Sequence, residues 1–139
     1  MEVVIAPESE LAVVAADAIE RLLRTKPGAV LGLATGSSPL RVYEELVRRH
    51  VEDGLSFAGV RGFMLDEYVG LPADHPERYR TVIEREFASR VDFAPDAVQG
   101  PDGLADDLPG ACAAYEAAIV AAGGVDLQLL GIGTDGHIG

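Results

Sequence analysis

Residues 29–39 read Ala-Val-Leu-Gly-Leu-Ala-Thr-Gly-Ser-Ser-Pro, and this stretch decides the fold. An unbroken apolar run such as residues 29–34 is typical of a β-strand that is covered on both faces. The Gly and Ser residues that follow predict a tight turn, and Pro39 suits the first turn of a helix. A buried strand that leads directly into a helix is the repeating unit of parallel α/β sheets.

The same alternation continues on both sides of this unit. Short apolar runs predict further strands at residues 2–5, 60–65 and 125–130. Apolar residues at helical spacing predict helices at residues 8–24, from Pro39 to about His50, at about 77–89 and at about 111–122. Residues 92–110 are rich in Pro, Gly and Asp and are expected to form a surface loop. Strands that alternate with helices predict a doubly wound, mostly parallel α/β sheet with helices on both faces.

Charge and composition argue against several classes of partner. The chain has 23 acidic and 11 basic residues and a formal net charge of −12, which disfavours nucleic acid and anionic membranes because both need clustered Lys and Arg. Neither a signal peptide nor a membrane span is expected, because no basic segment or long apolar core follows Met1. The single Cys112 excludes an intrachain disulfide, favours a cytoplasmic protein, and is expected to be a small packing residue in an Ala-rich helix.

The loop after residues 29–34 contains a candidate anion site. Thr35, Ser37 and Ser38 offer hydroxyl groups, and Gly36 lets the backbone approach a ligand closely. The start of the following helix offers free N–H groups and positive partial charge, which suit a phosphate. The alternative is an ordinary turn in which a Ser side chain caps the helix.

Two further loops leave predicted strands at the edge where open α/β sheets bind ligands. Asp66 and Glu67 follow the strand at 60–65, where a partly shielded carboxylate can act as a general base, unless both are simply solvated. Asp135 and His137 lie in the Gly-rich segment 131–139, where the carboxylate can orient a proton-transferring His, unless the His is only a surface residue. Neither a metal-binding Cys/His cluster nor a dinucleotide-binding Gly pattern is found in the sequence.

Four segments together carry a resemblance to a known family. They are GLATGSSP (32–39), FMLDEYVGL (63–71), HPERY (75–79) and GIGTDGHIG (131–139). In this order and roughly this spacing they resemble the glucosamine-6-phosphate deaminases, which have the Rossmann-like sugar-phosphate isomerase fold. The first and last segments are shared with the related 6-phosphogluconolactonases, whereas the LDEYVGL and HPERY pair is more specific to the deaminases.

The resemblance implies a reaction and a set of roles. Glucosamine 6-phosphate and water would become fructose 6-phosphate and ammonium, without a metal or an organic cofactor. Asp66 would take the C2 proton of the opened sugar, and His137, assisted by Asp135, would shuttle a proton during ring opening. The substrate-binding residues are expected to be Thr35, Gly36, Ser37, Ser38 and Glu67. The family also implies a homo-oligomer that binds a small sugar phosphate.

In the family, an Asn-Glu pair follows the DGHI motif within a few residues, and this Glu belongs to the ring-opening group. The present sequence ends at Gly139, before that pair. Residues 1–139 are therefore expected to be the N-terminal part of a single, truncated domain, inactive and marginally stable alone. Two alternatives are a 6-phosphogluconolactonase-like enzyme and a non-catalytic sugar-phosphate-binding regulatory module.

Overall fold

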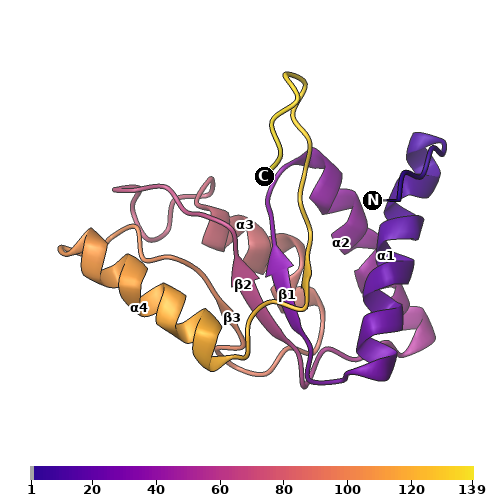
Figure 1. Cartoon of the computed structure of the whole chain (residues 1–139), viewed down its shortest axis with the longest axis horizontal. Coiled ribbons are helices and arrows are strands. Elements are labelled where there is room, and N and C mark those ends of the chain that lie inside the picture. The colour runs from indigo at the N-terminus through magenta and orange to yellow at the C-terminus, as the bar shows by residue number, and fades with distance from the viewer. Residues whose placement is uncertain (1) are drawn as a thin grey trace.

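The computed structural model, drawn in Figure 1, describes residues 2–139. It contains a four-stranded parallel sheet in the order β3-β2-β1-β4. The strands are β1 (Val30–Leu33), β2 (Arg61–Met64), β3 (Val98–Gln99) and β4 (Leu127–Gln128). The helices are α1 (Glu8–Thr25), α2 (Ser37–Asp53), α3 (Tyr79–Glu86) and α4 (Leu108–Ala121), with a 3₁₀ turn, η1, at Ala88–Arg90. The alternation of strands and helices and the parallel pairing confirm the predicted α/β class.

The strand register directs alternate side chains of the sheet toward different helices. Leu33 of β1 pairs with Met64 of β2, and both pack in the buried core that includes residues of α1, α2 and α3. Phe63 pairs with Gly32 and points to the opposite face, where its ring lies 5.8 Å from the ring of Tyr115 in α4. Helices therefore cover both faces of the sheet, as predicted.

A buried arginine joins α1 to α2. The Arg49 guanidinium, in a side chain that is only 7% exposed, lies 2.7 Å from Asp17, 2.6 Å from Glu20 and 2.8 Å from Glu45. The first two acids are on α1 and the third is on α2. These ion pairs fix the position of α2, whose first turn belongs to the candidate site.

Several predictions about single segments were wrong. Residues 2–5 are irregular and Ile5 is 94% exposed, because β-branched side chains favour a strand only where a partner strand pairs with it. The 92–110 loop contains the short strand β3, which pairs with β2. The helix predicted at 77–89 is regular only to Glu86, and η1 follows it. Cys112 is exposed, since α4 has no buried residue.

A helix that crosses a membrane must be both long and apolar. Of the helices in residues 2–139, none combines the length and the apolar character that a bilayer crossing needs.

Candidate active site

The first candidate loop starts from a rigid point at the end of β1. The buried Tyr43 hydroxyl donates to the Ala34 carbonyl at 2.7 Å and accepts from the Ala34 N–H at 3.1 Å. Two residues later, Gly36 has a φ of 108°, which residues with a Cβ rarely adopt. This backbone turns the chain sharply into α2.

The start of α2 presents donors for an anion. Gly36 is the N-cap residue and the structure has no side-chain cap there, so the alternative of a Ser cap is not what the structure shows. The N–H groups of the first helical residues, Ser37 and Ser38, have no acceptor within the helix. Because the helix dipole adds positive partial charge at this end, the turn can hold a phosphate or carboxylate group.

A pocket of about 160 Å³ lies between this turn and the Gly-rich segment 131–139. Its lining residues are Thr35, Gly36, Ser37, Ser38, Pro39, Gly131, Ile132, Gly133, His137 and Gly139. The two loops approach closely, since a Cβ added to Gly131 would lie 3.6 Å from the Pro39 Cδ. The structure thus brings the first and third predicted loops together.

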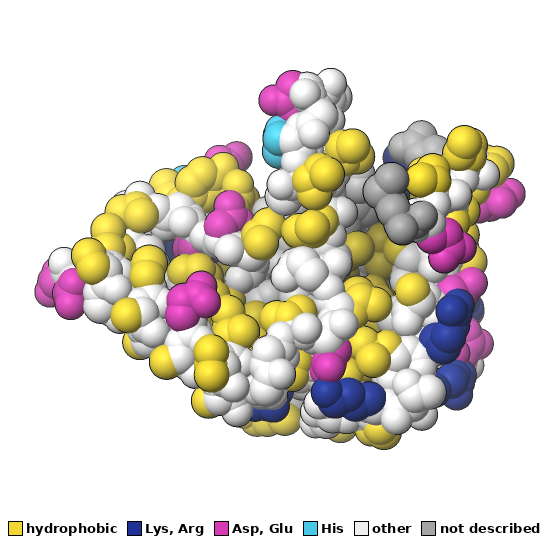
Figure 2. Space-filling view, in the orientation of Figure 1, with side chains coloured by type: hydrophobic (Ala, Val, Ile, Leu, Met, Phe, Trp, Pro, Cys, Tyr) yellow, Lys and Arg dark blue, Asp and Glu magenta, His cyan; other side chains and the backbone are white. Residues whose placement is uncertain are grey.

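The third loop projects beyond the sheet as a narrow hairpin (Figure 1), and its His and acidic side chains lie near the tip (Figure 2). His137 Nδ1 lies 2.5 Å from Asp135 Oδ1, and this hydrogen bond is the main reason that the pKa of Asp135 is lowered. A Cβ on Gly133 would lie 2.3 Å from His137 Cε1, so only glycine leaves room for the imidazole ring. The pair is oriented but solvent-exposed, with side-chain exposures of 66% for His137 and 75% for Asp135.

Asp66 lies two residues after the end of β2. Its side chain is open to solvent, yet partial burial, and next the charge of Glu67, raise the pKa of its carboxyl group. The preceding Leu65 lies beside the end of the third loop, because a Cβ on Gly139 would lie 3.4 Å from the Leu65 Cδ2. Asp66 itself does not line the 160 Å³ pocket.

Sequence reasoning missed one residue that connects the first two loops. The Tyr79 side chain interacts with Thr35 of the first loop and with Asp66 and Tyr68 of the second. Tyr79 is the last residue of the HPERY segment, and this position could have indicated a role at the site. In the sequence, however, the segment indicated only the resemblance to the family. Through Tyr79 the first and second loops are in physical contact and do not merely share an edge of the sheet.

Glu67 has a different position from the one expected. Its side chain is only 1% exposed, and it accepts hydrogen bonds from backbone N–H groups at the start of α3. The carboxylate therefore faces the helix, and we correct its expected substrate-binding role to a structural one. No group of three or more His, Cys, Asp or Glu side chains within residues 2–139 is arranged to hold a metal ion.

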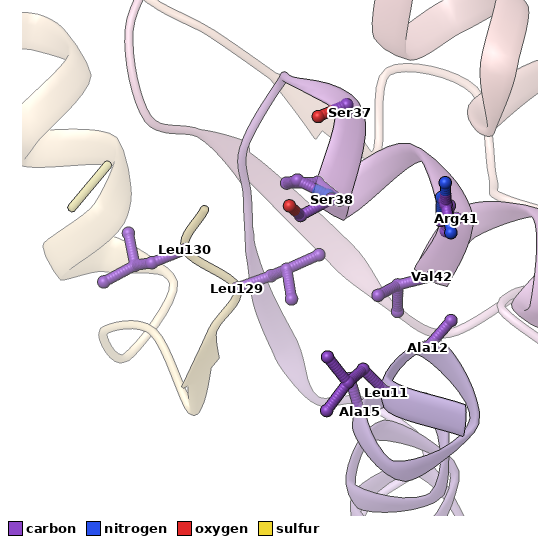
Figure 3. Close-up of a pocket in the computed structure, with 10 residues that line it drawn as sticks. Leu11, Ala12, Ala15, Ser37, Ser38, Arg41, Val42, Leu129 and Leu130 are labelled. Atoms are coloured by element: carbon purple, nitrogen blue, oxygen red, sulfur yellow. The ribbon is translucent and has the colours of Figure 1, made fainter. Parts of the chain in front are cut away.

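A second pocket, of about 220 Å³, lies beside the same turn (Figure 3). Aliphatic side chains form most of its wall, and they come from α1, α2 and the end of β4: Leu11, Ala12, Ala15, Val42, Leu129 and Leu130. Ser38 and Arg41 contribute its polar groups. A hydrophilic sugar phosphate suits the smaller, more polar pocket at His137 better.

Comparison with known proteins agrees with the arrangement of the loops. Residues 6–139 match the family model described as glucosamine-6-phosphate isomerases/6-phosphogluconolactonase. Proteins named glucosamine-6-phosphate deaminase from Mycolicibacterium smegmatis and Beutenbergia cavernae are 71% and 70% identical over 99% of this chain, which covers 53% of each. The chain thus spans about half the length of the curated relatives it matches.

Solved structures that resemble this chain come from the same two kinds of enzyme. A structure described as a monomeric glucosamine-6-phosphate deaminase superposes with a TM-score of 0.94 at 40% identity, over 99% of this chain and 58% of that one. A 6-phosphogluconolactonase from Thermotoga maritima gives a TM-score of 0.75 at 29% identity, over 93% of this chain and 59% of that one. With a matching family model over nearly its whole length, the chain belongs to the family of glucosamine-6-phosphate isomerases and 6-phosphogluconolactonases.

Proposed function

We propose that the full-length protein containing this chain is a glucosamine-6-phosphate deaminase. The observation that carries the proposal is the shared pocket of the α2 N-terminus and His137, with Leu65, the neighbour of Asp66, lying beside Gly139 of that pocket. The high identity to relatives named as deaminases supports the same reaction. In that reaction, glucosamine 6-phosphate and water give fructose 6-phosphate and ammonium.

The turn at α2 is proposed to bind the phosphate group. Ser37 and Ser38 offer two hydroxyl and two N–H donors at the positive end of the α2 dipole. Thr35 and Gly36 complete the turn beside them. A phosphate held here would direct the sugar carbons toward His137 and Asp66.

His137 and Asp66 are proposed to move the protons. His137 transfers a proton between the ring oxygen and the C1 hydroxyl as the sugar opens, while Asp135 holds the imidazole in one orientation. Asp66 then removes the C2 proton, and the same proton can return at C1. Water next adds to the imine at C2 and ammonium leaves, which balances the reaction. A raised pKa makes the Asp66 carboxylate a stronger base than an ordinary one.

Asp66→Asn in a full-length protein tests this assignment. The amide keeps the shape of the side chain but accepts no proton, so we expect a loss of ammonium release of at least about 10²-fold. Asp74→Asn is the matched control, because this exposed carboxylate lies in the same loop. Solvent deuterium incorporation at C2 identifies the base, and exchange at the unmodified rate in Asp66→Asn would refute its role.

The same assay separates the alternative functions. A 6-phosphogluconolactonase would hydrolyse 6-phosphogluconolactone and release no ammonium from glucosamine 6-phosphate. A regulatory module would bind the sugar phosphate and convert neither compound. The deaminase proposal predicts turnover of glucosamine 6-phosphate in preference to the lactone.

We also infer that the protein acts in the cytoplasm and forms a homo-oligomer. Each subunit is proposed to be a single domain, of which residues 1–139 are a part. The single cysteine supports a cytoplasmic location. The homo-oligomer follows from the resemblance, whereas one solved relative is described as monomeric. Light scattering on the full-length protein distinguishes the two assemblies.

A further inference from the structure

The buried carboxylate of Glu67 connects the second loop to the helix that follows it. Its Oε1 accepts from the N–H of Tyr68 at 2.8 Å and of Tyr79 at 3.0 Å, and its Oε2 accepts from the N–H of Arg80 at 2.9 Å. The last two N–H groups belong to the first turn of α3. The side chain of Glu67, the residue next to Asp66, therefore holds the start of α3, which lies twelve residues later in the chain.

A carboxylate suits this position better than an amide. Three N–H donors converge on its two oxygens, whereas a Gln side chain would offer one oxygen and turn an NH₂ group toward a donor. Arg78 adds a compensating charge, with its Nε 3.7 Å from the Glu67 Oε2. The Arg78 Nε has no hydrogen-bond partner within the described residues, and its ion pair with Glu67 compensates the charge of both groups.

The first residue of α3 carries this connection on to the site. The Tyr79 hydroxyl donates to the Tyr68 hydroxyl at 3.0 Å, and the two rings lie 4.6 Å apart. The same hydroxyl interacts with Thr35 of the first loop, and Asp66 is close enough to affect it electrostatically. The hydrogen bond to Tyr68, followed by partial burial, raises the pKa of Tyr79 to about 12, so the phenol remains a proton donor at neutral pH.

We propose that Glu67 is a positioning residue: by holding the second loop to the start of α3, it fixes Asp66 and places the Tyr79 hydroxyl between Asp66 and Thr35. The proposal rests on the proposed function for its kinetic consequences. A misplacement of a catalytic group by about 1 Å can lower the rate about 10²-fold. Loss of the connection should therefore lower kcat far more than it changes KM.

The test uses a full-length chimera in which this chain is continued by the second half of the Mycolicibacterium smegmatis relative. In Glu67→Gln we expect kcat to fall roughly 10- to 100-fold with KM changed less than about threefold. Glu77→Gln is the matched control, because it removes an equal charge from an exposed position in the same segment. Glu67→Asp keeps the charge but shortens the side chain, so its kcat should also fall.

The pH profile separates positioning from a general loss of stability. The titratable groups that interact with Asp66 are Glu67 in its own loop and Tyr79 from α3. Because the charge of Glu67 raises the pKa of Asp66, the acid limb of kcat/KM should move to lower pH in Glu67→Gln. It should stay in place in Glu67→Asp and in Glu77→Gln.

Unchanged kcat and an unchanged acid limb in Glu67→Gln would overturn the positioning role while leaving the proposed reaction intact. If the unmodified chimera converts no glucosamine 6-phosphate, the proposed function fails instead. Amide hydrogen exchange on the chimera then decides the inference: Glu67→Gln should speed exchange at Tyr79 and Arg80 about tenfold or more relative to Glu77→Gln. Equal exchange in the two variants would overturn the connection itself.

Discussion

Removing one buried hydroxyl, in Tyr43→Phe, should destabilise the protein at the point where the first site loop begins. Tyr43 makes two hydrogen bonds to Ala34, of 2.7 and 3.1 Å, and Ala34 is only 2% exposed. Without the hydroxyl, a buried N–H and a buried C=O lose the partner that the structure provides, at about 1–3 kcal/mol for each group. The ring itself stays stacked on Phe87 with centroids 4.7 Å apart, so packing changes little. We expect a loss of about 2–4 kcal/mol in the free energy of unfolding.

Urea unfolding followed by circular dichroism measures this loss, with Tyr115→Phe as the matched control. The Tyr115 hydroxyl donates to the Met64 carbonyl at 2.6 Å, but it is only partly buried, so water can replace it. The control should cost about 0.5–1.5 kcal/mol. A loss in Tyr43→Phe no larger than that in Tyr115→Phe would refute the reasoning, because burial of the unpaired groups would then not matter.

Three further predictions concern other parts of the fold. Arg49→Ala should cost about 1.5–3 kcal/mol because it removes a buried guanidinium that pairs with the half-buried Glu20 and Glu45, whereas Arg48→Ala, at a side chain that is 43% exposed, should cost less than about 1 kcal/mol; equal losses in urea unfolding would contradict this. The hydrogen bond from Arg48 lowers the pKa of Glu45 from 4.5 to about 2, so it adds stability above pH 4.5 that is lost as the pH falls toward 2. Thermal melts at several pH values should show this decline, and Glu45→Gln should flatten it; an unflattened decline would assign it to other groups. Gly133→Ala should displace the His137 ring and lower ammonium release by the full-length protein, and unchanged turnover would show that the ring orientation is unimportant.

The sequence predicted the elements that bury a continuous apolar face. The run at 29–34 and the helical spacing of α1 and α2 each carry enough apolar residues to specify their own structure. The pairing of β-strands, in contrast, depends on residues that are far apart in the chain. Strand β3 has only two residues and exists because Gly62 and Phe63 of β2 pair with it, while residues 2–5 have strand composition but are irregular.

In the candidate site, too, some features could be predicted from the sequence and others could not. The types of side chain and their order at the strand ends were visible in the sequence, so Ser37, Ser38 and His137 could be placed at one edge in advance. The direction in which each side chain points was not visible. Asp66 and Glu67 are adjacent carboxylates, and the resemblance gave the base role to Asp66 and substrate binding to Glu67, but only the position of α3 shows that Glu67 is buried against a helix. Packing of distant elements, rather than local chemistry, makes that distinction.

The four tyrosines of the chain suggest how such a site is kept rigid. Each hydroxyl lies at the carboxyl edge of the sheet: Tyr43 bonds Ala34 after β1, Tyr115 bonds Met64 at the end of β2, and Tyr68 bonds Tyr79 above the second loop. Tyr43, Tyr79 and Tyr115 lie on helices. The packing of each helix therefore holds the tyrosine ring in place and, through its hydroxyl, fixes a strand end or a loop. Within residues 2–139 no tyrosine hydroxyl is hydrogen-bonded to the third loop, and the hydrogen bonds of its His137 are to Asp135 and Gly133 of the same hairpin. We therefore expect the phosphate turn and Asp66 to keep their positions in free and ligand-bound protein, and the segment 131–139 to account for most of any movement. Crystal structures of the full-length protein with and without a sugar phosphate would test this, and a larger shift of the α2 turn than of His137 would contradict it.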